Sequence, residues 1–274
     1  MSSTTARLTV AVSAPDVVLF DLDGTLVDHD LAAATAISSW AADEGWHLPD
    51  VVRVWEAVSE RHFPAYRARM LTFAGQRRAR LRDFLPLVGV DVSGWEDARL
   101  DLAFAEYDRR YAAAWTAFPE AEAALRAHPR TAVLSNGNQA QQEDKLRRTG
   151  LLSHLEAVFT SDGIGVAKPD AAVFRSACQR LGVEPGRAVY AGDRLDVDAR
   201  AATAAGLRGV WLNRGGAQAP TDVLSITSLT ELGVLLRDWR RGGSRRAGLG
   251  TDACLVLSSD GLSPHRRQAG APQQ

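Results

Sequence analysis

Lysine and cysteine are nearly absent from this sequence. The two cysteines, Cys178 and Cys254, cannot build a disulfide framework and form no Cys-x-x-Cys pair, so we expect a reducing compartment. The only lysines, Lys145 and Lys168, are the only candidates for chemistry that needs an amine. No apolar run approaches the ~18 residues that span a bilayer, and the first residues lack a secretory pattern. These absences predict a cytoplasmic protein with no membrane partner.

Charge and histidine content exclude two further classes of site. The formal net charge is −1, so the chain has no overall basic footprint for nucleic acid. The six histidines are scattered without ligand spacing, which argues against a zinc site. With 46% hydrophobic residues, the chain has ample material for a core. Composition carries no signal for the oligomeric state.

Strand and helix patterns alternate along most of the chain. Short apolar runs predict strands, and stretches of ten or so residues between them predict helices: strands at 17–20, 132–134, 158–160, 188–191 and 209–212, and helices at 139–148, 171–181 and 197–205. Such alternation is typical of an α/β fold with a Rossmann-like parallel sheet flanked by helices.

A long helical stretch interrupts this alternation after the first strand. Residues 31–115 predict four or five helices and no strand, so we expect an inserted α-helical cap domain there. The α/β core domain then comprises residues 15–30 and 116–240. Residues 241–274 are rich in Gly, Arg and Ser and predict a disordered tail, with a weak strand pattern at 254–257.

Polar residues follow the predicted strands, where ligands bind in open α/β sheets. They are Asp21 and Asp23 after the first strand, Ser135, Asn136 and Gly137 after the second, Lys168-Pro169-Asp170 beyond the third, and Gly192-Asp193 to Asp198 after the fourth. Carboxylates, a hydroxyl and an ammonium should therefore meet at one edge of the sheet.

This combination suits phosphoryl transfer. A carboxylate can attack phosphorus and split one difficult displacement into two easier ones. A hard divalent cation such as Mg²⁺ would offset the repulsion between that carboxylate and the phosphate. Because residues two apart in an extended segment project to the same side, Asp21 and Asp23 can both face the phosphate, one attacking and the other handling protons.

In this order, the four motifs resemble those of the haloacid dehalogenase (HAD) superfamily. They are Asp21-Leu22-Asp23-Gly24-Thr25-Leu26, Ser135-Asn136-Gly137, Lys168-Pro169-Asp170 and Gly192-Asp193…Asp198, within roughly residues 17–214. The helical insert resembles the α-helical cap of that superfamily's first subclass. Each motif alone is often only a turn or a loop, and the conjunction of four in order carries the interpretation.

The resemblance implies a role for each motif residue. Asp21 would be the nucleophile, Asp23 the general acid/base, and Ser135 and Lys168 the groups that hold and neutralise the phosphate. The remaining substrate contacts would come from Gly24, Thr25, Asn136 and Gly137.

The resemblance also implies a set of magnesium ligands. They are Asp21, the backbone carbonyl of Asp23, Asp193 and Asp198, with Asp196 as a substitute for Asp198.

Several alternatives can be weighed on single residues. An EF-hand loop needs its glycine at the sixth position, whereas Gly24 is fourth, and neither lysine precedes Ser or Thr as in a P-loop. Within the superfamily, dehalogenases lack the second aspartate, and phosphonate-cleaving relatives need a cap lysine that is missing here. A phosphomutase is disfavoured because His29 lies a few residues early. A catalytically idle scaffold is disfavoured because the acidic residues are intact.

The insert contains two further groups that bear on recognition. Six arginines between 67 and 82 could bind an anionic substrate, but we interpret most of them as a solvated helix face. Its tryptophans are interpreted as the core of the insert. The sequence therefore predicts a Mg²⁺-dependent phosphohydrolase that acts on a small phosphorylated metabolite through an aspartyl phosphate, and it does not identify the metabolite.

Overall fold

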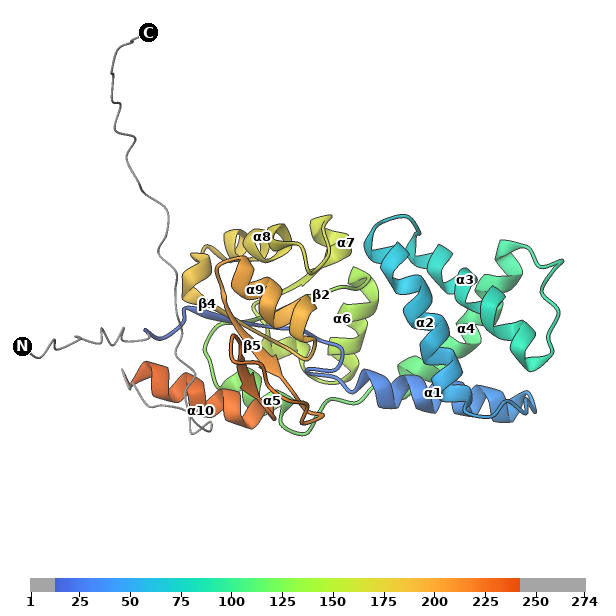
Figure 1. Cartoon of the computed structure of the whole chain (residues 1–274), viewed down its shortest axis with the longest axis horizontal. Coiled ribbons are helices and arrows are strands. Elements are labelled where there is room, and N and C mark those ends of the chain that lie inside the picture. The colour runs from blue at the N-terminus through green and yellow to red at the C-terminus, as the bar shows by residue number, and fades with distance from the viewer. Residues whose placement is uncertain (1–12, 242–274) are drawn as a thin grey trace, which may run out of the picture.

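The computed structural model describes residues 13–241, and a six-stranded parallel sheet forms its centre (Figure 1). The strand order is β3-β2-β1-β4-β5-β6. The strands are β1 (Val17–Phe20), β2 (Thr131–Ser135), β3 (Ala157–Thr160), β4 (Ala188–Gly192), β5 (Arg208–Leu212) and β6 (Leu224–Ile226). The predicted α/β fold class is confirmed.

Helices cover both faces of the sheet, which explains why its central strands are apolar throughout rather than alternating. One face packs against α5 (Ala121–Arg126), α6 (Gln139–Arg148) and α10 (Leu229–Arg240). The other packs against α8 (Ala171–Leu181) and α9 (Ala201–Ala204). Every residue of β1, β2 and β4 is buried.

The strand order reverses beside β1, and this places the site. The chain runs from β1 outward to β2 and β3 on one side, then returns to β4, β5 and β6 on the other. The Asp21 amide donates a hydrogen bond to the Ala191 carbonyl at 2.9 Å, so the carboxyl ends of β1 and β4 lie side by side. A crevice forms where such a reversal occurs, and ligands of α/β proteins bind there.

A helical insert, defined here as α1 to α4, separates β1 from β2 and lies beyond the carboxyl end of the sheet (Figure 1). The helices are α1 (His29–Asp43), α2 (Val51–Arg67), α3 (Phe73–Phe84) and α4 (Asp97–Ala113), with a 3₁₀ turn at Leu85–Val88. They bury an aromatic core of their own, in which Trp40 and Trp55 are almost fully enclosed. The interpretation of these two tryptophans as core residues is confirmed.

Two elements differ from the sequence-based expectation. The segment predicted as one helix over 197–205 begins earlier, as a π-helical stretch Leu195–Arg200 that passes into α9. Its widened turn lets Asp198 Oδ2 accept a hydrogen bond from the Arg194 amide at 3.0 Å, and such π turns are frequent at functional sites. Strand β6 has only three residues, too few for a strand pattern to stand out.

Some expectations concern residues outside the described range. The predicted tail beyond residue 241 and its weak strand at 254–257 lie there. Short helical turns complete the described part: Leu152–His154, α7 (Ser161–Ile164) and Pro185–Arg187. No helix within residues 13–241 has the length and apolar character needed to cross a membrane.

Candidate active site

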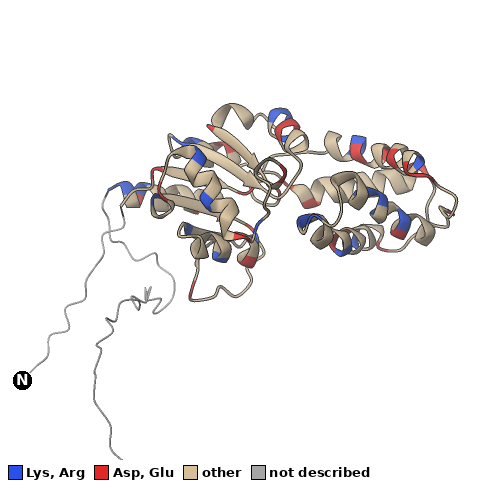
Figure 2. Ribbon diagram, turned by 90° about the horizontal axis from the view of Figure 1, so that it is seen from above, with Lys and Arg blue, Asp and Glu red and all other residues tan. Residues whose placement is uncertain are grey.

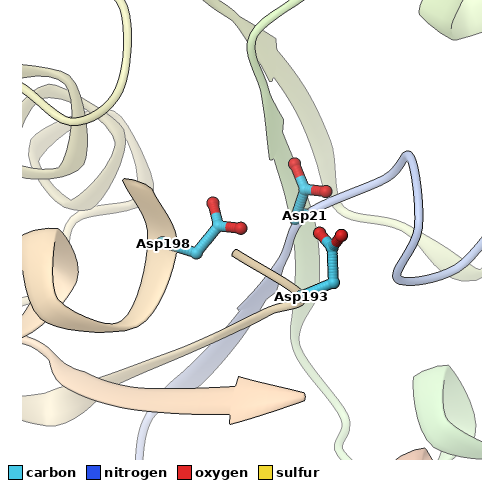
Figure 3. A group of neighbouring side chains, drawn as sticks. All are labelled: Asp21, Asp193 and Asp198. Atoms are coloured by element: carbon cyan, nitrogen blue, oxygen red, sulfur yellow. The ribbon is translucent and has the colours of Figure 1, made fainter. Parts of the chain in front are cut away.

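Three carboxylates meet at the carboxyl end of the sheet (Figure 3). Asp21 directly follows β1, Asp193 follows β4, and Asp198 lies on the π turn. Each offers an oxygen, and these oxygens lie within 4.8 Å of one another. Asp196, the sequence-based substitute for Asp198, instead is exposed and pairs with Arg200 at 2.8 Å. The structure therefore brings Asp198, and not Asp196, into the acidic cluster.

Lys168 connects this cluster to the sheet. Its ammonium donates hydrogen bonds to Asp21 Oδ1 at 2.6 Å, Asp198 Oδ1 at 2.6 Å and the Tyr190 hydroxyl at 2.7 Å. Burial alone would lower the pKa of Lys168, but the two carboxylates outweigh burial and raise it, so the ammonium stays charged. Lys168 is itself positioned by Asn136, whose side-chain amide forms two 2.8 Å hydrogen bonds with the Lys168 backbone.

The charges in this cluster do not balance. Burial raises the pKa of Asp21 well above its usual value, Asp198 and Asp193 raise it further, and Lys168 opposes them. Burial, followed by the charge of Asp198, raises the pKa of Asp193 to about 6. Three carboxylates face a single ammonium, and oxygen ligands in excess of positive charge are what a hard divalent cation needs. The donor set fits Mg²⁺.

Asp23 lies beside this cluster but faces different partners. Lys145 forms an ion pair with Asp23 Oδ1, and Gln142 Nε2 donates to Asp23 Oδ2 at 2.9 Å. Burial would raise the pKa of Asp23, but the Lys145 charge, assisted by His29, outweighs it and lowers the pKa to about 2. The side chain is therefore held as a carboxylate in a fixed orientation.

The insert reaches this carboxylate through Tyr111 of α4. The Tyr111 hydroxyl accepts a hydrogen bond from Lys145 Nζ at 3.0 Å and lies 2.6 Å from His29 Nδ1. His29, at the start of α1, is 3.9 Å from Asp23 Oδ1. One end of the insert thus lies near Asp23 through His29, and the other contacts the Lys145 partner of Asp23 through Tyr111. Sequence reasoning missed Lys145, Gln142 and Tyr111 as partners of Asp23, and it weighed His29 only in connection with a phosphomutase; the one available signal was that Lys145 is one of two lysines.

Most of the residues predicted to contact the substrate line the cavity. Ser135 Oγ accepts a 3.1 Å hydrogen bond from Gln142 and lines the cavity, as do Asn136 and Gly137. Gly24 lines it as well.

Gly24 and Thr25 both lie against the Asp193 carboxylate. Gly24 has φ +82°, and a Cβ there would lie 2.5 Å from Asp193 Oδ2, so the loop needs glycine. Thr25 is fully buried, and its hydroxyl is 3.5 Å from Asp193 Oδ1, outside the residues that line the cavity. Thr25 therefore orients a carboxylate and does not itself contact the cavity.

A cavity of about 520 Å³ lies between the acidic cluster and the insert. The sheet side contributes Asp21, Lys168 and Asp193, and the insert contributes aromatic and polar side chains of α2, α3 and α4. This volume suits a small metabolite and falls within the range of ordinary ligand pockets.

A family model described as haloacid dehalogenase-like hydrolase matches residues 15–206. Most of the chain is covered, including all four motifs. The chain belongs to the family of haloacid dehalogenase-like hydrolases, and the resemblance carried by the motifs is confirmed.

Solved structures support the same fold. The HAD-hydrolase YfnB of Bacillus subtilis superposes with a TM-score of 0.71 at 23% identity, covering 82% of this chain and 100% of that one. The defluorinating L-2-haloacid dehalogenase Rha0230 gives a TM-score of 0.65 at 27% identity, covering 81% of this chain and 94% of that one.

Curated relatives include several phosphatases. The phosphoserine phosphatase of Thermus thermophilus is 40% identical over 117 residues, which are 41% of this chain and 45% of that protein. The human N-acylneuraminate-9-phosphatase is 32% identical over 118 residues, which are 41% of this chain and 48% of that protein. Each match thus spans less than half of the relative's length.

Proposed function

We propose that this protein is a Mg²⁺-dependent phosphomonoesterase that acts on a small phosphorylated metabolite through an aspartyl phosphate on Asp21. The observation that carries the proposal is the buried contact of Asp21 with Lys168, beside Asp193 and Asp198, at the end of β1. The phosphatase relatives support the same reaction. The cavity of about 520 Å³ supports a small ester as substrate. Positively and negatively charged residues are interspersed over the described helices (Figure 2).

The residues of the acidic cluster would hold Mg²⁺. Asp21, Asp193 and Asp198 would supply carboxylate oxygens, and the Asp23 backbone carbonyl another. Bound there, the ion would neutralise phosphate charge and reduce its repulsion of the nucleophile. Lys168 adds a fixed positive charge on the same side, and Ser135 and the backbone of the Asn136-Gly137 turn line the space where phosphate oxygens would lie.

The chain's own residues then carry out two displacements. Asp21 attacks phosphorus and expels the alkoxide, which takes a proton from Asp23; Asp23 next removes a proton from the water that hydrolyses the aspartyl phosphate. Since Lys145 holds Asp23 as a carboxylate, Asp23 must gain a proton before the first step. An ammonium is a far weaker acid than this carboxylic acid, so the proton would come from solvent, while Lys145 orients Asp23.

Asp23 also separates this proposal from dehalogenation, the reaction named for some of the solved neighbours. Displacement of a halide needs no proton donor for the leaving group, whereas an alkoxide does. A carboxylate held by Lys145 and Gln142 serves no evident purpose in a dehalogenase. The proposal therefore rests on phosphate chemistry.

Hydrolysis of p-nitrophenyl phosphate, with and without Mg²⁺, tests the proposal. We expect activity that EDTA removes and Mg²⁺ restores, and Asp21→Asn should reduce it by at least about 10⁴-fold because the covalent route is lost. Asp198→Asn should impair activity strongly, while Asp196→Asn, a matched change at the exposed neighbour, should not. Full activity in Asp21→Asn, or inactivity of the wild type against a broad panel of phosphate esters, would refute the proposal.

A further inference from the structure

Arg80 differs from the arginines around it on α3. Arg78 and Arg82 lie on the outer face and pair with Asp97, at 3.0 Å in the case of Arg82. Arg80 points inward and is only 7% exposed. It lies one turn after Gln76 and one turn before Phe84, so these three residues share the buried face of the helix. The solvated-face interpretation covers most of the six arginines; it fits Arg78 and Arg82, and Arg80 is an exception.

The Arg80 guanidinium has aromatic neighbours but no counter-ion. Its Cζ lies 4.3 Å from the Trp55 ring centroid and 5.7 Å from that of Tyr107. Within residues 13–241 no carboxylate forms an ion pair with Arg80, and its Nε has no hydrogen-bond partner. By contrast, the nearby Arg77 pairs with Asp108 at 3.0 Å.

Burying a charge without a partner is costly, so its retention needs a reason. Two neighbours have unused polar atoms as well: Trp55 Nε1 is a donor without an acceptor, and Gln76 Oε1 is an acceptor without a donor in the described part of the chain. All three side chains line the cavity that also contains Asp21. Arg80 thus places a buried cation at the wall of that cavity.

We propose that Arg80 binds a second anionic group on the leaving group of the substrate, so that the preferred substrates are phosphate esters of hydroxy acids or bisphosphates. This inference rests on the proposed function, because it places the ester phosphate at Asp21 and the second anion at Arg80. Aromatic rings surround Arg80 and leave it 7% exposed, and an anion gains more from a guanidinium in such surroundings than at the surface.

Matched substrates test the proposal. One series comprises ω-phosphooxy carboxylic acids with one to five methylene groups, each paired with its primary amide, which has the same length but no second charge. A second series pairs α,ω-alkanediol bisphosphates with the corresponding monophosphates, and it distinguishes a phosphate from a carboxylate as the second anion. For at least one pair we expect the charged member to have a kcat/KM about 10- to 150-fold higher, the range for one charge-assisted hydrogen bond.

Arg80→Met should collapse that ratio to near one, and Arg80→Lys should retain part of it. Arg82→Met, the same change at the exposed arginine two residues on, should leave the ratio as in the wild type. The proposal is overturned when no charged substrate surpasses its neutral partner in the wild type, or when Arg80→Met lowers both members of a pair equally.

Binding to Asp21→Asn, measured by calorimetry with the same pairs, separates this inference from the proposed function. Tighter binding of the charged member, lost in the double variant with Arg80→Met, supports the anion site even where no ester is hydrolysed. Equal binding of both members contradicts it. Absence of turnover with charge-selective binding refutes only the proposed reaction.

Discussion

Buried cations have different partners in the α/β part of the molecule and in the helical insert. Beside the sheet, Lys168 contacts Asp21 and Asp198, and Lys145 contacts Asp23. In the insert, Arg80 is enclosed by aromatic rings with no carboxylate paired to it among the described residues. In the first arrangement each buried cation has a carboxylate partner and holds that carboxylate in place before substrate arrives. The second is incomplete without an anion, as expected of a residue that selects the substrate.

Among these buried cations, removal of Lys168 should reduce the free energy of unfolding the most. Lys168→Met leaves Asp21 and Asp198 buried together without a counter-ion, so the free energy of unfolding should fall by about 3–5 kcal/mol. Urea unfolding in the presence of EDTA measures this without compensation by a metal. A loss below about 1 kcal/mol would show that Lys168 does not stabilise the buried charges of Asp21 and Asp198.

Lys145 should affect rate more than folding. Lys145→Met removes the partner that orients Asp23, so kcat should fall about 10²- to 10³-fold with little change in KM. The pKa of Asp23 should rise from about 2 once the ammonium is gone. Because Asp23 must be ionised to accept a proton from water, the acidic limb of the pH–rate profile should move to higher pH.

Lys145→Arg is the control for that variant, since it retains the charge and should recover part of the rate. An unchanged pH profile in Lys145→Met would mean that Lys145 does not control the ionisation of Asp23.

Arg80 should behave in the opposite way to Lys168. Because no described carboxylate depends on it, Arg80→Met should change the free energy of unfolding by less than about 1 kcal/mol, or increase it, since an uncompensated buried charge is replaced by an apolar side chain. Urea unfolding of the free protein gives the value. Destabilisation as large as that of Lys168→Met would make Arg80 a structural residue.

The smallest effect is expected at the surface of the same helix. Arg82→Met breaks an exposed pair with Asp97 and should cost no more than about 0.5 kcal/mol, a cost that salt should diminish. Urea unfolding at low and high ionic strength checks this. A cost comparable to that of Lys168→Met would remove the distinction between buried and exposed cations drawn above.

Much of the architecture could be predicted from the sequence because it is local. Apolar runs in β1 and β4 and the residues directly after them follow from strand burial and from the rule that ligands bind at carboxyl ends. Asp21, Lys168 and Asp193 meet as that rule requires, and helix 171–181 has the predicted bounds. Asp198 could be chosen over Asp196 only once the π turn was seen.

The missed residues act across long sequence separations. Gln142 and Lys145 lie on one face of α6 and contact Asp23, which is more than a hundred residues away in the sequence. No motif encodes these contacts. Arg78, Arg80 and Arg82 look alike in a strongly polar segment. Which of them is buried depends on the face of α3 that packs against Trp55, and that is a property of tertiary packing.

The central claim is that Asp21 becomes phosphorylated. Rapid acid quench of the protein with a ³²P-labelled ester, followed by peptide mapping, tests it most directly. We predict a hydroxylamine-sensitive label on the peptide that contains Asp21, present in Asp23→Asn and lost in Asp21→Asn. Turnover with no label on this peptide, or a label that survives in Asp21→Asn, would contradict the account.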